Sequence, residues 1–141
     1  MSNTKGTVNI DNVTISAGHN TQINAVMNAG TMNFTSNNTI NSSVLNTGII
    51  NLDGTNKFSS SITGNGNGIV ILNSGSVDLT SSVVSDNTFT MNDGTIKIGS
   101  ATFAKSVFNA NKGSLSVIDD EYKNYSFGSI NSTEDFEFSI D

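Results

Sequence analysis

Short runs of alternating apolar and polar residues recur along the whole chain. Each run lasts four or five residues and is bounded by Gly, Asn or Ser. Such runs are typical of short β-strands with one buried face, because successive side chains of a strand point to opposite sides. No segment of the sequence carries the apolar stripe with a period of 3.6 residues that marks an amphipathic helix. The pattern therefore predicts an all-β protein.

The alternating runs follow a repeated motif, Asn-x-Gly. Its five copies begin at Asn28, Asn46, Asn73, Asn92 and Asn111, and the glycines are Gly30, Gly48, Gly75, Gly94 and Gly113. Each copy precedes two alternating apolar residues: Met32 and Phe34, Ile50 and Leu52, Val77 and Leu79, Ile96 and Ile98, Leu115 and Val117. Successive asparagines are 18, 27, 19 and 19 residues apart. The spacing indicates a structural repeat of about 19 residues.

Two further apolar groups in each repeat bring the number of short strands to three per repeat. Three strands in so few residues leave room only for tight turns, which is the organisation of a β-solenoid. We expect a single-stranded parallel β-helix of about six coils, stacked about 4.8 Å apart. Right-handed winding is expected, because parallel crossovers almost always take that hand. The expected division is one domain, 1–141, with a lead-in at 1–5, repeat coils at 6–118 and an acidic terminal coil or capping strand at 119–141.

The motif residues have physical roles in such a solenoid. Glycine can adopt a positive φ at a tight corner between strands. An asparagine amide has two donor hydrogens and an acceptor, so asparagines stacked at one corner can bond to each other from coil to coil. The sequence predicts a ladder of this kind through the five motif asparagines. Ordinary turn chemistry without a ladder is the alternative.

Two coils are longer than the others. Extra residues fall near 16–20 and, about eight of them, around Thr63–Gly68. Insertions in solenoids become loops at corners, so we expect loops at both places. Apolar residues make up 35% of the chain, which suits a thin repetitive core better than a compact one. Disorder is the alternative for a chain rich in Asn, Ser and Thr, but disordered tracts lack evenly spaced alternation.

Charge excludes some functions. The net charge is −6, Arg is absent, and the acidic excess lies entirely after residue 118. Nucleic-acid binding needs clustered Lys and Arg, which this chain lacks. No apolar run approaches the length of a membrane helix, and the start has no apolar signal-peptide core. We therefore expect no nucleic-acid partner and no membrane insertion by this chain.

The phrases "NAGTMNF", "NTGIINL", "NSGSVDL" and "NDGTIKI" resemble the repeats of bacterial autotransporter passenger domains and related haemagglutinin-type β-helix proteins. The resemblance covers roughly residues 4–118. It implies a secreted or surface-displayed stalk that serves in adhesion, aggregation or biofilm formation. The signal peptide and the membrane barrel segment of that family have no counterpart here, so we expect a passenger fragment or an unrelated solenoid with the same repeat. An extracellular or cell-surface location is the corresponding expectation.

Catalytic chemistry finds little support in the residues. Asp78 and Lys97 occupy equivalent outward positions and predict an exposed ion pair rather than an acid–base pair. His19 is the one histidine and lies in a polar stretch. Calcium-binding loop patterns are absent from the sequence, so no metal or cofactor is expected. A non-enzymatic structural or adhesive solenoid is the main hypothesis, and a phage tail-fibre or carbohydrate-active β-helix is a lesser one.

The two ends of the solenoid suggest a second hypothesis, a filament subunit that stacks end to end. The outermost coils of a solenoid expose strand edges and a slice of core. The candidate end-contact residues are Val8, Ile10, Phe136, Phe138 and Ile140. The expected partners are therefore further copies of the chain, or a host or cell-surface glycan or protein.

Overall fold

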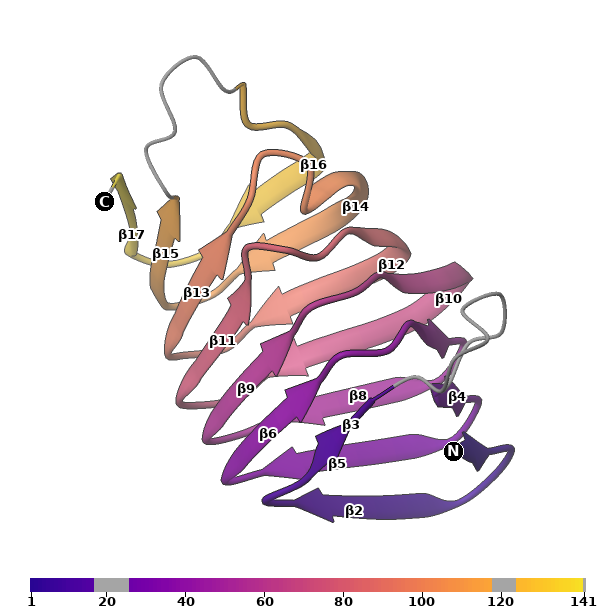
Figure 1. Cartoon of the computed structure of the whole chain (residues 1–141). Coiled ribbons are helices and arrows are strands. Elements are labelled where there is room, and N and C mark those ends of the chain that lie inside the picture. Colours follow the sequence, from indigo (N-terminus) through magenta and orange to yellow (C-terminus); the bar gives the residue numbers. More distant parts are fainter. Residues whose placement is uncertain (17–25, 118–123, 141) are drawn as a thin grey trace.

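The computed structural model describes residues 1–16, 26–117 and 124–140, with the side chain of Ile140 left out. In these residues the chain forms a β-solenoid of about six turns without any helix. Figure 1 shows the coils stacked from the indigo N-terminal coil to the yellow C-terminal coil. The predicted fold class is confirmed.

Each coil has three faces, which the chain visits in the same order. The first face holds β1 (Ser2–Asn3), β4 (Val26–Asn28) and β7 (Val44–Asn46). The second face holds β2 (Thr7–Asp11), β5 (Thr31–Thr35) and β8 (Ile49–Leu52). Longer strands run over both faces in the later coils: β10 (Ile62–Leu72), β12 (Val84–Met91), β14 (Phe103–Ala110) and β16 (Phe127–Ser132).

The third face is a separate seven-stranded sheet along the described part of the chain. Its strands are β3 (Thr14–Ile15), β6 (Asn37–Ile40), β9 (Thr55–Phe58), β11 (Ser76–Leu79), β13 (Thr95–Ile98), β15 (Gly113–Val117) and β17 (Phe136–Ile140). All pairings between the described strands are parallel and join one coil to the next. We call the bend between the first and second faces the first corner, and the bend between the second and third faces the second corner.

Parallel pairing in register places equivalent side chains above one another as buried columns. The second face contributes two such columns, which are Met32, Ile50, Val70, Phe89 and Phe108, and Phe34, Leu52, Leu72, Met91 and Ala110. A third-face column consists of Ile40, Phe58, Leu79, Ile98 and Val117. Alternation with a period of two therefore fills a continuous apolar core.

The core changes in character along the rod. In the later coils Phe103 stacks on Phe108 with ring centroids 4.9 Å apart, and Phe89 lies 5.2 Å from Phe103. Phe127 adds a further ring 5.9 Å from Phe103. Aromatic pairs at such distances contribute about 0.5–1.5 kcal/mol beyond the area they bury. Aromatic packing thus adds to the aliphatic columns in the C-terminal half.

The five Asn-x-Gly motifs do not occupy one position in the coil, which corrects the single-column alignment expected from the sequence. Gly30 and Gly48 lie at the first corner, whereas Gly75 lies one strand later, at the second corner. As a result Val77 pairs with Asn56 rather than with Ile50. The 27-residue spacing between the second and third copies combines one coil with this shift by one strand.

The two segments that the sequence predicts to be long are 16–20 and Thr63–Gly68. The run Thr63–Gly68 belongs to β10, with a register shift between those two residues, and not to a large separate loop. The pairing offset increases from 18, at Leu45↔Thr63, to 20, at Ile49↔Ile69, so this segment adds two residues to the coil rather than eight. The expected insertion at 16–20 lies, after Ser16, outside the described residues.

A charge in a core column should abolish the fold. Ile96 is fully buried between Val77 and Leu115, so Ile96→Asp places an unpaired carboxylate in the apolar core. We expect loss of the cooperative unfolding transition in circular dichroism. Thr95→Asp, at the adjacent outward position, should unfold within about 0.5 kcal/mol of the parent. A cooperative transition of parental midpoint in Ile96→Asp would show that the inward assignment is wrong.

Candidate functional site

A buried ladder of amides runs along the inside of the first corner. Asn3 Nδ2 donates to Asn28 Oδ1 at 3.0 Å, Asn28 Nδ2 to Asn46 Oδ1 at 2.9 Å, and Asn46 Nδ2 to Asn87 Oδ1 at 3.1 Å. The second hydrogen of each amide is also used: Asn28 donates to Ile49 O at 2.8 Å. These side chains are almost completely buried. The ladder therefore satisfies polar groups that face the core.

The ladder requires asparagine, because each member must both donate and accept along the column. A carboxylate would present acceptors to both neighbours and would carry a buried charge. Asn28 and Asn46 are the two motif asparagines in this ladder. Asn3 and Asn87 were missed by the sequence reasoning, since neither begins an Asn-x-Gly motif.

The other three motif asparagines form a second ladder, on the outside of the second corner. Asn92 Nδ2 donates to Asn73 Oδ1 at 3.2 Å, and Asn111 Nδ2 donates to Asn92 Oδ1 at 2.9 Å. The Thr133 hydroxyl extends the series by donating to Asn111 Oδ1 at 3.0 Å. This ladder is solvent-exposed, so the expectation of one inward ladder through all five asparagines is corrected. The amide-to-amide bonds themselves are present at both corners.

A separate pair of hydrogen-bonded side-chain amides lies on the inner side of the third face. Asn38 Nδ2 donates to Asn56 Oδ1 at 3.0 Å, and both side chains are buried. Asn56 Nδ2 also donates to Asp53 O at 2.8 Å. In the next coil the same inward position is taken by Val77. The 18-residue spacing of Asn38 and Asn56, equal to that of the first-corner pair, was an available signal for this contact.

The motif glycines answer to two different constraints. At the second corner Gly75, Gly94 and Gly113 have φ of 85°, 100° and 106°, in line with Asn12 and Ser36, which also have positive φ. At the first corner Gly30 and Gly48 have no positive φ. There a Cβ would collide with the carbonyl oxygen of the preceding coil's glycine. Close stacking, rather than φ, thus requires glycine at these two positions.

The outer surface of the second face has two adjacent outward columns without charge, although Asp11 is exposed at the end of β2 on the same face. Its central outward column is Asn9, Asn33, Asn51, Ile71, Thr90, Asn109 and Asn131, and the adjacent column is Thr7, Thr31, Ile49, Ile69, Thr88, Val107 and Ser129. No charged residue occurs in either column. We call these two columns the amide face. Hydrogen bonds between side-chain amides link Asn9, Asn33 and Asn51 at 2.8 and 2.9 Å. A further one links Asn109 with Asn131 at 2.9 Å.

Two ion pairs lie on the third face and at the second corner. Asp78 is flanked in register by Lys57 and Lys97, and its ion pair is with Lys57 at 3.5 Å. Partial burial by itself would raise the pKa of Asp78, but hydrogen bonds from Thr80 and the charge of Lys57 outweigh it and lower that pKa. At the second corner Lys112 lies 3.5 Å from Asp93. These exposed pairs each contribute under about 1 kcal/mol.

A surface hollow on the third face surrounds the carboxylate of Asp78. The hollow around Asp78, lined by Thr55, Lys57, Thr95 and Lys97, offers one carboxylate that already has an ammonium partner. Three or more His, Cys, Asp or Glu side chains gather nowhere in residues 1–16, 26–117 and 124–140 to hold a metal. His19 and the acidic group 119–121 lie outside these ranges. The described residues form no helix, and they therefore contain no helix that could span a membrane.

The predicted end-contact residues are distributed between surface and core. Phe138 is 49% exposed, whereas Ile10 is buried beneath Phe34. Val8 and Phe136 are partly buried against the core. Ile140 continues the register of β17 opposite Val117.

Comparison of the chain with family models, curated proteins and solved structures gives no match. The geometry of the solenoid itself is therefore the basis for any functional conclusion.

The buried ladder should contribute more to stability than the exposed one. Asn46→Ala removes an amide that bonds to Asn28, Asn87 and Ile69 O, and it leaves buried groups unpaired. We expect a loss of about 1–3 kcal/mol in the free energy of unfolding, measured by denaturant titration. The control Asn92→Ala, on the exposed ladder, should lose no more than about 0.5 kcal/mol. Equal losses would contradict the two-ladder arrangement.

Glycine substitutions can separate close stacking from backbone strain. Gly75→Ala combines a positive φ with a collision against Gly54 O, so we expect a loss of about 2–4 kcal/mol. Gly66 has a similar φ of 89°, but an added Cβ meets no atom within 4 Å. Gly66→Ala should therefore lose only about 1–2 kcal/mol. The measurement is thermal unfolding of both variants, and a Gly66→Ala loss as large as that of Gly75→Ala would refute the stacking constraint.

Proposed function

We propose that this chain is a non-catalytic structural rod whose amide face binds neutral glycan at a bacterial surface or in a secreted protein. The observation that carries the proposal is the amide face, two outward columns without a charged residue over the length of the described solenoid. The resemblance of the repeats to surface-displayed passenger domains supports the same role and location.

The chemistry of the amide face suits sugar hydroxyl groups. Asparagine amides and threonine hydroxyls each donate and accept hydrogen bonds, as sugar hydroxyls do. Ile49, Ile69 and Val107 are exposed between them and offer apolar contact to the C–H surface of a sugar ring. A neutral surface also imposes no desolvation of unpaired charge when it is covered.

The geometry favours a polymer over a single small molecule. Rows repeat about every 4.8 Å along the rod, and every row except that of Ile69 and Ile71 presents an amide or hydroxyl group. Coil-to-coil bonds such as Asn33 to Asn51, at 2.9 Å, fix these side chains before any ligand binds. Fixed side chains lose little entropy on binding, so many weak contacts along a repeating chain can add up.

A binding assay on immobilised neutral polysaccharides tests the proposal. Thr90→Glu puts a charge in the centre of the amide face and should weaken retention at least about tenfold, because the charge would be covered without a partner. Thr39→Glu is the matched control on the third face, beside Lys57, and should bind like the parent.

Three results would overturn this function. The parent protein could fail to bind any neutral glycan, or both glutamate variants could bind equally weakly. Release of reducing sugar during the assay would instead establish catalysis and contradict the structural role.

A further inference from the structure

The first and last described coils present unpaired strand edges. Among the described residues β2 pairs only with β5, and β3 ends the third-face sheet. At the opposite end β16 and β17 are the last strands of their sheets. Figure 1 shows these strands at the two extremes of the stack. Such edges carry free backbone donors and acceptors that can pair with another chain.

Apolar side chains accompany both edges. At the C-terminal coil Ile130 and Phe138 are 47% and 49% exposed, more than the most exposed flank residue of the inner coils, Met27, at 41%. At the N-terminal coil Val13 is exposed, and Val8 is only partly buried. The two ends of the solenoid thus leave parts of their core columns uncovered.

The columns of the two ends match when the register is continued by one coil. A second copy placed on the C-terminal coil sets its Thr7, Val8 and Asn9 against Ser129, Ile130 and Asn131. On the third face its Val13 falls against Phe138. Each of these pairs joins polar with polar or apolar with apolar, whereas Ile10 falls against Ser132.

The outward amide ladder also continues with the correct direction. On the amide face each of these asparagines donates towards the N-terminal coil, as Asn33 does to Asn9 and Asn131 does to Asn109. Asn9 of the next copy would donate in the same direction to Asn131 Oδ1. No side chain has to reverse for the ladder to cross the junction.

From this match we propose that the chain assembles head to tail, with β16 and β17 of one copy pairing in parallel with β2 and β3 of the next. Each copy uses two different surfaces, one at each end, and the symmetry operation that relates successive copies runs along the solenoid axis. Repetition therefore gives an open filament rather than a closed dimer. The assembly does not depend on the glycan contact of the amide face.

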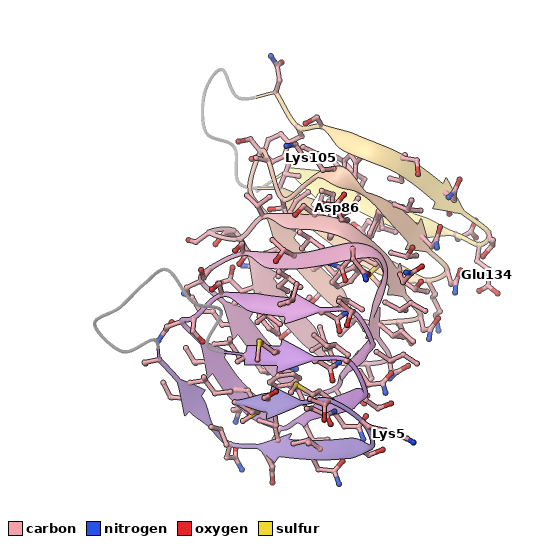
Figure 2. The ribbon with its side chains drawn as sticks, turned by 90° about the vertical axis from the view of Figure 1, so that its right-hand side faces the viewer. Lys5, Asp86, Lys105 and Glu134 are labelled. Atoms are coloured by element: carbon pink, nitrogen blue, oxygen red, sulfur yellow. The ribbon has the colours of Figure 1, made fainter. Side chains whose placement is uncertain are left out.

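Charge opposes tail-to-tail pairing. The C-terminal coil carries Glu134, Asp135 and Glu137, so two such ends would repel each other. The N-terminal coil holds Lys5 and Asp11, one of each sign. Figure 2 shows Lys5 and Glu134 at opposite ends of the stack. Head-to-tail contact keeps the three carboxylates away from their own copies, and the continued register of the columns favours it over head-to-head contact.

Sedimentation and negative-stain microscopy of the purified chain test the proposal. The parent should form concentration-dependent filaments one solenoid wide. Phe138→Glu should raise the concentration for assembly at least about tenfold, because it puts an unpaired charge in the junction. The matched control Met27→Glu, at an exposed apolar residue on the flank and outside the amide face, should assemble like the parent. Circular dichroism melting checks that both variants are folded.

Mixing two variants tests the direction of assembly. Val13→Glu blocks the head and leaves the tail free, whereas Phe138→Glu blocks the tail and leaves the head free. Neither should assemble alone, but together they should form a dimer that does not grow. Self-association of Val13→Glu alone would indicate tail-to-tail contact and overturn the proposal. A parent that stays monomeric at all concentrations, or loss of assembly in Met27→Glu, would overturn it equally.

Discussion

Parallel backbone pairing between successive coils is the interaction on which the rest of this structure depends. It places every side chain directly above its equivalent in the neighbouring coil, about 4.8 Å away. A side chain at an inward position must therefore be compatible with a copy of its own kind. Isoleucine, leucine and phenylalanine satisfy that condition by packing, and asparagine satisfies it because its amide both donates and accepts.

The two halves of the rod meet this condition in different ways. In the N-terminal half, buried amides at Asn28, Asn46, Asn38 and Asn56 bond along the axis. In the C-terminal half, Val77 and its equivalents take the third-face amide position, and phenylalanine rings fill the centre. The N-terminal half gains directional hydrogen bonds, which fix the register. The C-terminal half gains buried apolar area and contacts between aromatic rings. Both solutions leave the backbone pairing unchanged.

Repetition also determines where function can reside. A stack of similar coils offers extended faces and two ends rather than one deep pocket, and the described ion pairs lie on open surface. The amide face and the terminal coils are the places where many equivalent groups act together. Binding by such surfaces depends on the rigidity of the scaffold, because each individual contact is weak.

The sequence by itself determined the fold class, the period of about 19 residues and the use of stacked asparagines. Alternation with a period of two also identified the inward residues Val77, Leu79, Ile96 and Ile98. These features follow from local patterns that repeat, so they need no knowledge of the tertiary contacts. The 27-residue spacing contained the further information that the motif moves by one strand.

Only the tertiary structure decided which corner each motif occupies. Asn-x-Gly suits either corner, because glycine permits close stacking at Gly30 and both close stacking and a positive φ at Gly75. The pairing of each strand with the neighbouring coils decides at which corner a motif lies, and with it the burial of Asn46 and the exposure of Asn92. Asn3 and Asn87 joined the buried ladder for the same reason. Whether an amide faces the core or the solvent depends on pairing partners that are about a coil or more away, which local pattern alone cannot specify.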